Sequence, residues 1–148
     1  MVNRLIRTLA SFYSRLPVKP FRGKLARLYQ AHQLANRNRA VIKAKVDGII
    51  YQLDLNELID RSIFYEGCFE PMTTAVINKY VNPGMTVLDI GANIGCHTLR
   101  LAKLVGKNGK VIAFEPMSWA YLRLKRNIEL NDFNNIILEK LALSNIQP

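Results

Sequence analysis

The sequence predicts an α/β fold in which short apolar strands alternate with amphipathic helices along the second half of the chain. Three apolar runs, Thr86 to Ile90, Lys110 to Glu115 and Asn135 to Leu141, are separated by two segments whose apolar residues recur at helical spacing. The connections between these segments are short. A β-α-β-α-β order of this kind specifies right-handed crossovers and a parallel sheet, the first half of a doubly wound fold.

Length and composition are typical of one globular domain rather than a disordered or disulfide-rich chain. The chain has 148 residues, of which 49% are hydrophobic and 22% are charged. Cys68 and Cys96 have no metal-ligand spacing, so we expect two buried thiols and no metal site. No apolar window approaches the roughly 18 residues of a spanning helix, and no secretory signal is present. We therefore expect a cytoplasmic protein.

The positive charge of the chain is concentrated near its amino terminus. The net charge is +10, yet the first 46 residues hold 11 Lys and Arg and no acid, so the rest of the chain is close to neutral. Within residues 1–39, apolar residues recur at helical spacing from Asn3 to Leu16, and again from Phe21 to Leu34. Residues 1–39 are therefore predicted to be a basic amphipathic helical segment.

Several roles fit a basic amphipathic segment, and the sequence leaves them open. Its apolar stripe can pack on its own domain, or residues 1–34 can lie on an anionic membrane surface, which would make the protein peripheral at the membrane. It can also serve as an organelle presequence. Nucleic-acid binding is disfavoured, because aromatic and basic residues are not interleaved on a strand platform.

Residues 40–70 are predicted to form a β-hairpin and a connector. Ala40 to Val46 and Ile49 to Leu55 are β-rich runs separated by Asp47-Gly48, a dipeptide that favours a type I′ turn. The stretch from residue 56 to residue 70 has mixed character. Pro71 is suited to the first position of a helix that continues to about Val81, and residues 71–148 are predicted to be the main domain.

The two helices between the predicted strands have one apolar face each. The first presents its apolar face through Ile94, Thr98, Leu101 and Val105, and the opposite face carries His97, Arg100 and Lys103. The second helix is expected to be capped by Ser118 and to end near Asn131, with Tyr121, Leu124 and Ile128 pointing inward. His97 is predicted to be a solvated or packed helix residue rather than a catalytic one.

The turn after the first predicted strand indicates a ligand site. Open parallel sheets bind ligands beyond the carboxyl ends of their strands, and this turn reads Asp-Ile-Gly-Ala-Asn-Ile-Gly from Asp89 to Gly95. A dinucleotide site has a glycine at the position of Asn93, where the backbone approaches a pyrophosphate, and a phosphate loop ends in Gly-Lys. The turn is therefore suited to a ligand that needs no pyrophosphate contact.

An acidic residue follows the second predicted strand. Glu115 stands where a carboxylate accepts hydrogen bonds from both hydroxyls of a ribose. S-adenosylmethionine fits this pattern better than NAD, because it has a ribose and an amino-acid moiety but no phosphate. The alternative is that Gly91 and Gly95 only permit tight packing, while Glu115 caps the following helix.

Several motifs together resemble the FkbM family of class I S-adenosylmethionine-dependent methyltransferases. The resemblance covers roughly residues 60 to 146 and rests on Val87 to Gly95, Ala113 to Pro116, Asn127 and Asn131, with Phe69-Glu70-Pro71 and Leu141 to Ser144 at its two ends. It implies a Rossmann-like class I methyltransferase sheet and O-methylation of a sugar or small metabolite. By this similarity Glu115 holds the ribose, Met117 lies near the adenine, and the methionine part is surrounded by Asp89, Gly91, Ala92, Asn93 and Gly95.

The resemblance also predicts what the chain lacks. A complete fold of this family has four more strands, so the chain is expected to be a fragment truncated after its third parallel strand. The acceptor pocket and any catalytic base would lie in the missing half, and no base is identified. We therefore expect no methyl transfer by the chain alone and a partner that supplies the missing half of the sheet. The rival interpretation is a non-catalytic cofactor-binding or membrane-surface assembly module.

Overall fold

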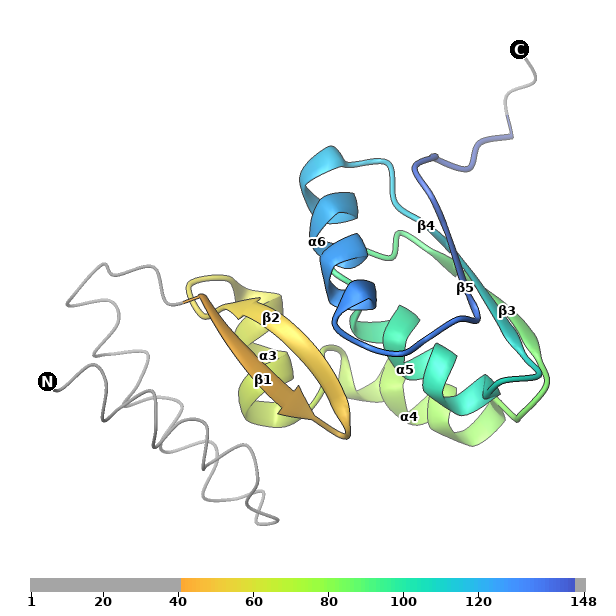
Figure 1. The fold of residues 1–148 in the computed structure, drawn as a ribbon, viewed down its shortest axis with the longest axis horizontal. Coiled ribbons are helices and arrows are strands. Elements are labelled where there is room, and N and C mark those ends of the chain that lie inside the picture. The colour runs from red at the N-terminus through yellow and green to blue at the C-terminus, as the bar shows by residue number, and fades with distance from the viewer. Residues whose placement is uncertain (1–40, 146–148) are drawn as a thin grey trace, which may run out of the picture. The chain divides into compact units, whose positions relative to one another are not determined.

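The computed structural model describes residues 41–145 and divides the chain into two compact units (Figure 1). The first unit spans residues 1–69 and the second spans residues 70–148. The predictions for residues 1–39, including both basic helices, lie outside the described residues.

The first unit contains the expected hairpin. Strands β1 (Val41–Val46) and β2 (Ile49–Asp54) pair antiparallel, and Asp47 and Gly48 have φ values of 52° and 82°. Positive φ at both central residues is what a type I′ turn requires, so the turn prediction is confirmed. The strand faces that are buried carry mainly apolar residues, namely Ala44, Val46, Ile49, Tyr51 and Leu53.

A short helix that the sequence did not predict follows the hairpin. Helix α3 (Leu58–Glu66) buries Ile63 and Phe64, contacts β2, and ends at Gly67, which adopts the left-handed conformation with φ of 82°. The helix has only nine residues, and Glu57 at its N-cap makes no side-chain cap hydrogen bond, so the usual start signal is absent. Cys68, expected to be buried, is only partly buried, because it lies beyond the end of α3.

The second unit has the predicted α/β order. Its elements are α4 (Pro71–Tyr80), β3 (Thr86–Ile90), α5 (Cys96–Val105), β4 (Lys110–Phe114), α6 (Ser118–Glu129) and β5 (Ile136–Glu139). The three strands form a parallel sheet in the order β3-β4-β5. The expected α/β fold class, with a parallel sheet and a preceding β-hairpin, is confirmed. Strand β5 ends at Glu139, two residues earlier than expected.

One face of this sheet is covered by helices α5 and α6, which lie on the same side of it (Figure 1). Two apolar clusters fill the space between the sheet and these helices. The first contains Leu101, Ala102, Val105 and Val111, and the second contains Ala92, Ala113 and Leu124. Burying these side chains contributes roughly 1.5 to 3 kcal/mol for each larger residue relative to its exposed state.

The opposite face of the sheet is open within the described residues. Strand register places Leu88 beside Ile112, which in turn lies beside Ile137, and Ile90 beside Phe114. These five residues are called the open face below. Leu88 is 55% exposed and Ile90 is 63% exposed. Thr86 to Ile90 forms the edge strand β3 of this sheet, and its outer face has no layer against it among residues 41–145.

The start of α6 also differs from the prediction. Ser118 is the first helical residue rather than the cap, and Met117 at the N-cap makes no side-chain cap hydrogen bond. The Glu115 carboxylate instead accepts a hydrogen bond from the Met117 amide at 2.8 Å. An acceptor supplied from the strand end thus replaces the predicted hydroxyl cap.

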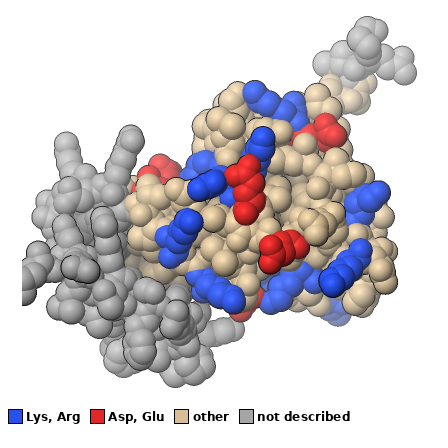
Figure 2. Space-filling view, in the orientation of Figure 1, with Lys and Arg blue, Asp and Glu red and all other residues tan. Residues whose placement is uncertain are grey.

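The surface of the described region has mixed charge. On the face seen in Figure 2, basic and acidic side chains are interspersed rather than gathered into a patch of one sign. None of the helices between residues 41 and 145 has the length and apolarity needed to span a bilayer.

Candidate functional site

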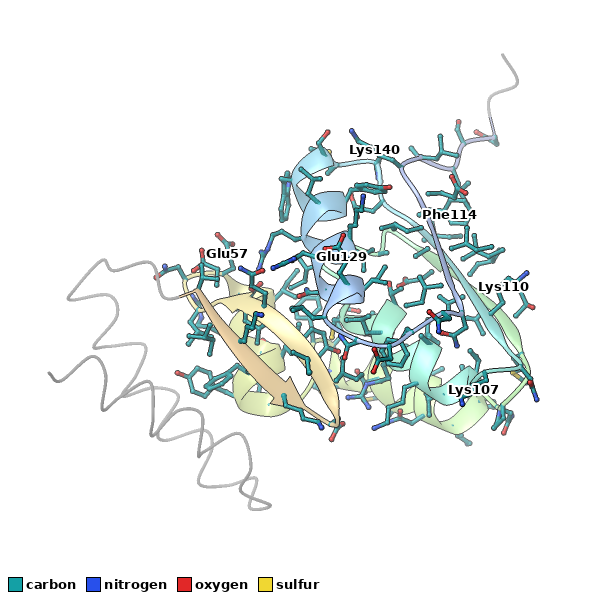
Figure 3. All side chains as sticks on the ribbon, viewed as in Figure 1. Glu57, Lys107, Lys110, Phe114, Glu129 and Lys140 are labelled. Carbon is teal, nitrogen blue, oxygen red and sulfur yellow. The ribbon has the colours of Figure 1, made fainter. Side chains whose placement is uncertain are left out.

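The predicted site residues gather at the carboxyl ends of two neighbouring strands. The turn from Gly91 to Gly95 follows β3, and Glu115 follows β4, which is the direct neighbour of β3 in the sheet. Figure 3 shows Phe114 at the carboxyl end of β4, opposite Lys110 at its start. The parallel register sets Ile90 beside Phe114, so the turn and Glu115 begin at the same level.

The backbone amides of the turn are used inside the protein. The amides of Gly91 and Ala92 donate to the Phe114 carbonyl at 2.9 and 3.0 Å, and the Gly95 amide donates to the Ala92 carbonyl at 2.9 Å. A pyrophosphate site needs such amides directed at the ligand. These three amides cannot serve a phosphate without breaking the turn, in agreement with the missing glycine at Asn93.

The two glycines of the turn have different roles. Gly91 has φ of 80°, and a Cβ built on it meets no atom within 4 Å, so the space beside it is open. Gly95 has φ of 95°, but a Cβ there would collide with the Cδ1 atom of Leu124, which is fully buried. Gly91 therefore leaves room for a ligand, whereas Gly95 allows α6 to pack against the turn.

Glu115 is buried and links the turn to the start of α6. Glu115 is only 5% exposed. Its Oε2 atom accepts a hydrogen bond from the Asn93 amide at 2.8 Å, and its Oε1 atom accepts one from the Met117 amide at 2.8 Å. A carboxylate has about four lone-pair positions, so these two bonds leave capacity for further donors. Capping of the helix and binding of a ribose are therefore compatible roles for this one side chain.

Asp89 lies in β3 with its carboxylate at the same end of the strand. Its Oδ2 atom accepts a hydrogen bond from the Thr98 hydroxyl. Burial raises the pKa of Asp89, while the Thr98 hydrogen bond and the nearby His97 lower it and the negative charge of Glu115 raises it. Burial is the largest of these effects, so the fold destabilises the charged form of Asp89 relative to its protonated form.

Asn93 and Met117 complete the set of predicted site residues. Asn93 has φ of 49°, and its Oδ1 atom is buried with no hydrogen-bond partner among the described residues. Met117 is 56% exposed. A buried acceptor without a donor is costly, by about 1 to 3 kcal/mol, so a ligand that supplies an N–H or O–H here would relieve that cost.

A buried asparagine that sequence reasoning did not assign holds the turn in place. The Asn127 side chain is fully buried, and its Nδ2 donates to the Ile94 carbonyl at 2.9 Å. Asn131 in turn donates to the Asn127 carbonyl at 2.8 Å. Two signals were available in the sequence: the FkbM resemblance includes Asn127, and this asparagine has the inward spacing of α6, between Leu124 and Ile128.

His97 is packed rather than solvated, which is one of the two environments expected for it. It is the second residue of α5, its side chain is 19% exposed, and its Nε2 lies 3.5 Å from Oε2 of Glu70. Glu70 directly precedes α4, so this contact connects the starts of two helices within the second unit.

Comparisons with known proteins agree with this geometry. The family model described as Protein-L-isoaspartate(D-aspartate) O-methyltransferase (PCMT) matches residues 54–141. The structure of M. jannaschii TYW2 in complex with AdoMet is 27% identical with a TM-score of 0.53, and the match covers 71% of this chain and 44% of that chain. Wild-type Trm5b from Pyrococcus abyssi is 24% identical with a TM-score of 0.52, and the match covers 69% of this chain and 28% of that chain. A search among curated proteins gave no match.

The matches support the coarse prediction of fold and cofactor. The chain spans less than half the length of either solved structure. The M. jannaschii structure is a complex with AdoMet, which is the cofactor that the sequence predicts for this chain. The family model covers more than half of the chain. The chain therefore belongs to the family of Protein-L-isoaspartate(D-aspartate) O-methyltransferases, and its parallel sheet has the class I S-adenosylmethionine-dependent methyltransferase fold.

Proposed function

We propose that this chain binds S-adenosylmethionine at the carboxyl ends of β3 and β4, as the cofactor-binding part of an O-methyltransferase of FkbM type. The observation that carries the proposal is the buried Glu115 carboxylate, which keeps acceptor capacity beside the open space at Gly91. A ribose offers two adjacent hydroxyls, and a buried carboxylate with spare lone pairs is the group that binds them best.

Each predicted site residue has a role in this proposal. Glu115 binds the ribose hydroxyls, and the exposed, apolar side chain of Met117 lies against the adenine. The residues that face the methionine part are Asp89, Gly91, Ala92, Asn93 and Gly95. The buried Oδ1 of Asn93, which has no donor within the described residues, supports contact with a hydrogen-bond donor of the ligand.

The charges of the site match a cationic cofactor. S-adenosylmethionine supplies an electrophilic methyl group on a positively charged sulfur. Asp89 and Glu115 place two carboxylates at adjacent strand ends, and the negative charge of Glu115 raises the pKa of Asp89. A positive ligand relieves this repulsion, so the site favours the charged cofactor over a neutral adenosine.

An oxygen acceptor is the second part of the proposal. The matching family is an O-methyltransferase family, and the FkbM resemblance implies a hydroxyl of a sugar or small metabolite. Among residues 41–145 the sheet is covered on one side only, which supports an acceptor wall that comes from outside these residues. The rival, a non-catalytic cofactor-binding module, predicts cofactor binding with no transfer to any acceptor.

Titration calorimetry on the full chain tests the cofactor assignment. S-adenosylhomocysteine is expected to bind and NAD is not. Glu115→Gln is expected to weaken S-adenosylhomocysteine binding by about 1 to 3 kcal/mol, because a neutral amide accepts fewer and weaker hydrogen bonds from the ribose. Glu129→Gln, at an exposed acid on α6, controls for loss of one negative charge.

A second ligand separates ribose binding from damage to the turn. The 2′-deoxy analogue of S-adenosylhomocysteine is expected to bind the unmodified chain more weakly than the parent, and Glu115→Gln is expected to remove that preference. Equal affinity of the unmodified chain for NAD and S-adenosylhomocysteine, or a preference for the 2′-hydroxyl that survives in Glu115→Gln, would contradict the proposed site.

A further inference from the structure

Glu70, which directly precedes α4, has an unusual backbone conformation. It has φ of 52° and ψ of 76°, in the left-handed region that side chains other than glycine adopt at a cost of about 1 kcal/mol or more. Its side chain makes no cap hydrogen bond to the helix that it precedes. The conformation is therefore not explained by capping of α4, and it sets the direction in which the carboxylate leaves the backbone.

Two neighbouring side chains lie beside the Glu70 carboxylate. The Thr73 hydroxyl donates to Oε2 at 3.2 Å, and Nε2 of His97 lies 3.5 Å from the same oxygen. The Glu70 side chain remains 53% exposed, while both ring nitrogens of His97 are buried with no hydrogen-bond partner among the described residues. His97 therefore faces Glu70 from the protein side, and the carboxylate keeps an accessible side.

His97 also connects Glu70 to the cofactor site. It follows the Gly91 to Gly95 turn by two residues and interacts electrostatically with Asp89 at the end of β3. Asp89 interacts in the same way with Glu115 at the end of β4. One turn farther along α5, the Arg100 guanidinium donates to Oδ1 of Asn78 on α4 at 3.5 Å. Two carboxylates, those of Glu70 and Asp89, therefore interact with His97.

We propose that Glu70 accepts hydrogen bonds from the α-ammonium group at the amino-acid end of the cofactor, with His97 and Thr73 as positioning residues for its carboxylate. This inference rests on the proposed function, because it assigns one end of the same cofactor. An ammonium group has three N–H donors and a positive charge, and a half-exposed carboxylate with a free oxygen is its natural partner. The backbone amides of Gly91, Ala92 and Gly95 offer no alternative, since amides are donors too.

Two ligands that differ only at the amino-acid end isolate this contact. S-adenosylhomocysteine carries the amino-acid group, whereas 5′-methylthioadenosine has the same adenosine and thioether without it. The full chain is expected to prefer S-adenosylhomocysteine in titration calorimetry. Glu70→Gln is expected to lower affinity for S-adenosylhomocysteine about 10- to 100-fold, the range of one charge-assisted hydrogen bond, and to change affinity for 5′-methylthioadenosine by less than about twofold.

Further variants test the positioning residues and the fold. Thr73→Val and His97→Gln are expected to reduce the preference for S-adenosylhomocysteine in part, and Thr73→Ser is expected to restore it. Asn78→Ala removes a contact between the same two helices without touching Glu70, so it is expected to leave the preference unchanged. Glu70→Gly relieves the left-handed strain, so this variant is expected to melt no lower than the unmodified chain while it loses the preference.

The outcomes separate this inference from the proposed function. If the unmodified chain binds S-adenosylhomocysteine, but Glu70→Gln and Glu70→Gly weaken both ligands equally or neither, then Glu70 does not bind the ammonium group. If the unmodified chain binds neither adenosine ligand, the result contradicts the cofactor assignment itself, and this inference, which depends on that assignment, is contradicted as well. Selective loss of S-adenosylhomocysteine in both Glu70 variants, with Asn78→Ala unaffected, supports the assignment.

Discussion

A single carboxylate, that of Glu115, sets the geometry of the candidate site. It fixes the Asn93 amide from one oxygen and the Met117 amide from the other, so the turn after β3 and the start of α6 are held to the same side chain. The motif spacing indicated an acid at this position. It did not indicate these two hydrogen bonds, because the sequence does not show which donors face the carboxylate in the fold. One donor, the Asn93 amide, is 22 residues away, and the other, the Met117 amide, is two residues away.

Asp89 makes stability depend on pH in a direction opposite to that of an ion-paired acid. Burial raises its pKa above the ordinary value of 3.8, so the folded state holds a proton more readily than the unfolded state does. The penalty for burying the charge is fully present above the folded pKa and disappears as the pH falls toward 3.8. Asp89→Asn is therefore expected to be more stable than the unmodified chain near pH 7. This gap, the difference between their free energies of unfolding, is expected to disappear at acidic pH.

Urea unfolding of Asp89→Asn and the unmodified chain at a series of pH values measures this gap. The asparagine retains an oxygen that can accept from Thr98, so the hydrogen bond is kept while the charge is removed. Asp132→Asn, at an exposed aspartate, is the matched control for charge removal. A gap that is independent of pH, or an unmodified chain that is the more stable one near neutrality, would contradict the direction assigned to the pKa of Asp89.

Among the elements, those with strong periodicity were predictable and those defined by their neighbours were not. The three strands and the helices α4, α5 and α6 were expected at close to their observed positions. Helix α3 was missed because it has nine residues and no side-chain cap, and β5 is shorter than its apolar run because pairing with β4 ends at Glu139. Pairing partners decide where a strand ends, and the local sequence does not contain them.

The two faces of β3 give a paired prediction. Leu88 belongs to the open face and is 55% exposed, whereas Val87 points into the cluster around Val111. Leu88→Lys is expected to change the free energy of unfolding by less than about 0.5 kcal/mol and to reduce self-association. Val87→Lys, one residue away, is expected to destabilise by more than about 2 kcal/mol, because it places a charge among apolar side chains.

Static light scattering and urea unfolding of the two β3 variants provide the measurements. Leu88→Lys should scatter less than the unmodified chain at the same concentration. A large loss of stability in Leu88→Lys would mean that the open face is covered in solution, and unchanged scattering would mean that it does not drive association.

At the scale of the whole molecule, the positive net charge of +10 comes from the first 46 residues, which hold 11 Lys and Arg and no acid. The described residues have interspersed charges on the face seen in Figure 2, so that face shows no single-sign patch. The role of residues 1–34 was left open by the sequence and lies outside the described residues. Charge and apolar patterning alone support the proposal of an anionic membrane surface as a partner.

Vesicle flotation of the full chain tests that proposal. Binding to vesicles that contain phosphatidylserine is expected to exceed binding to phosphatidylcholine vesicles and to decrease as salt rises, because the attraction is electrostatic. Replacing Arg4, Arg7 and Arg15 with Gln is expected to weaken it, by roughly 1 kcal/mol for each charge near the surface. Equal binding to both vesicle types, or no binding to either, would favour a segment that packs on its own domain.

The hydrogen bond from Asn127 to the Ile94 carbonyl has a consequence for how the site forms in time. It spans 33 residues, and the contact between Gly95 and Leu124 spans a similar length of chain. A nascent chain that has emerged only as far as α5 contains every residue of the turn but none of its long-range contacts. The site therefore forms late during synthesis, once α6 has docked, and its assembly is governed by closure of this long loop rather than by the local turn sequence.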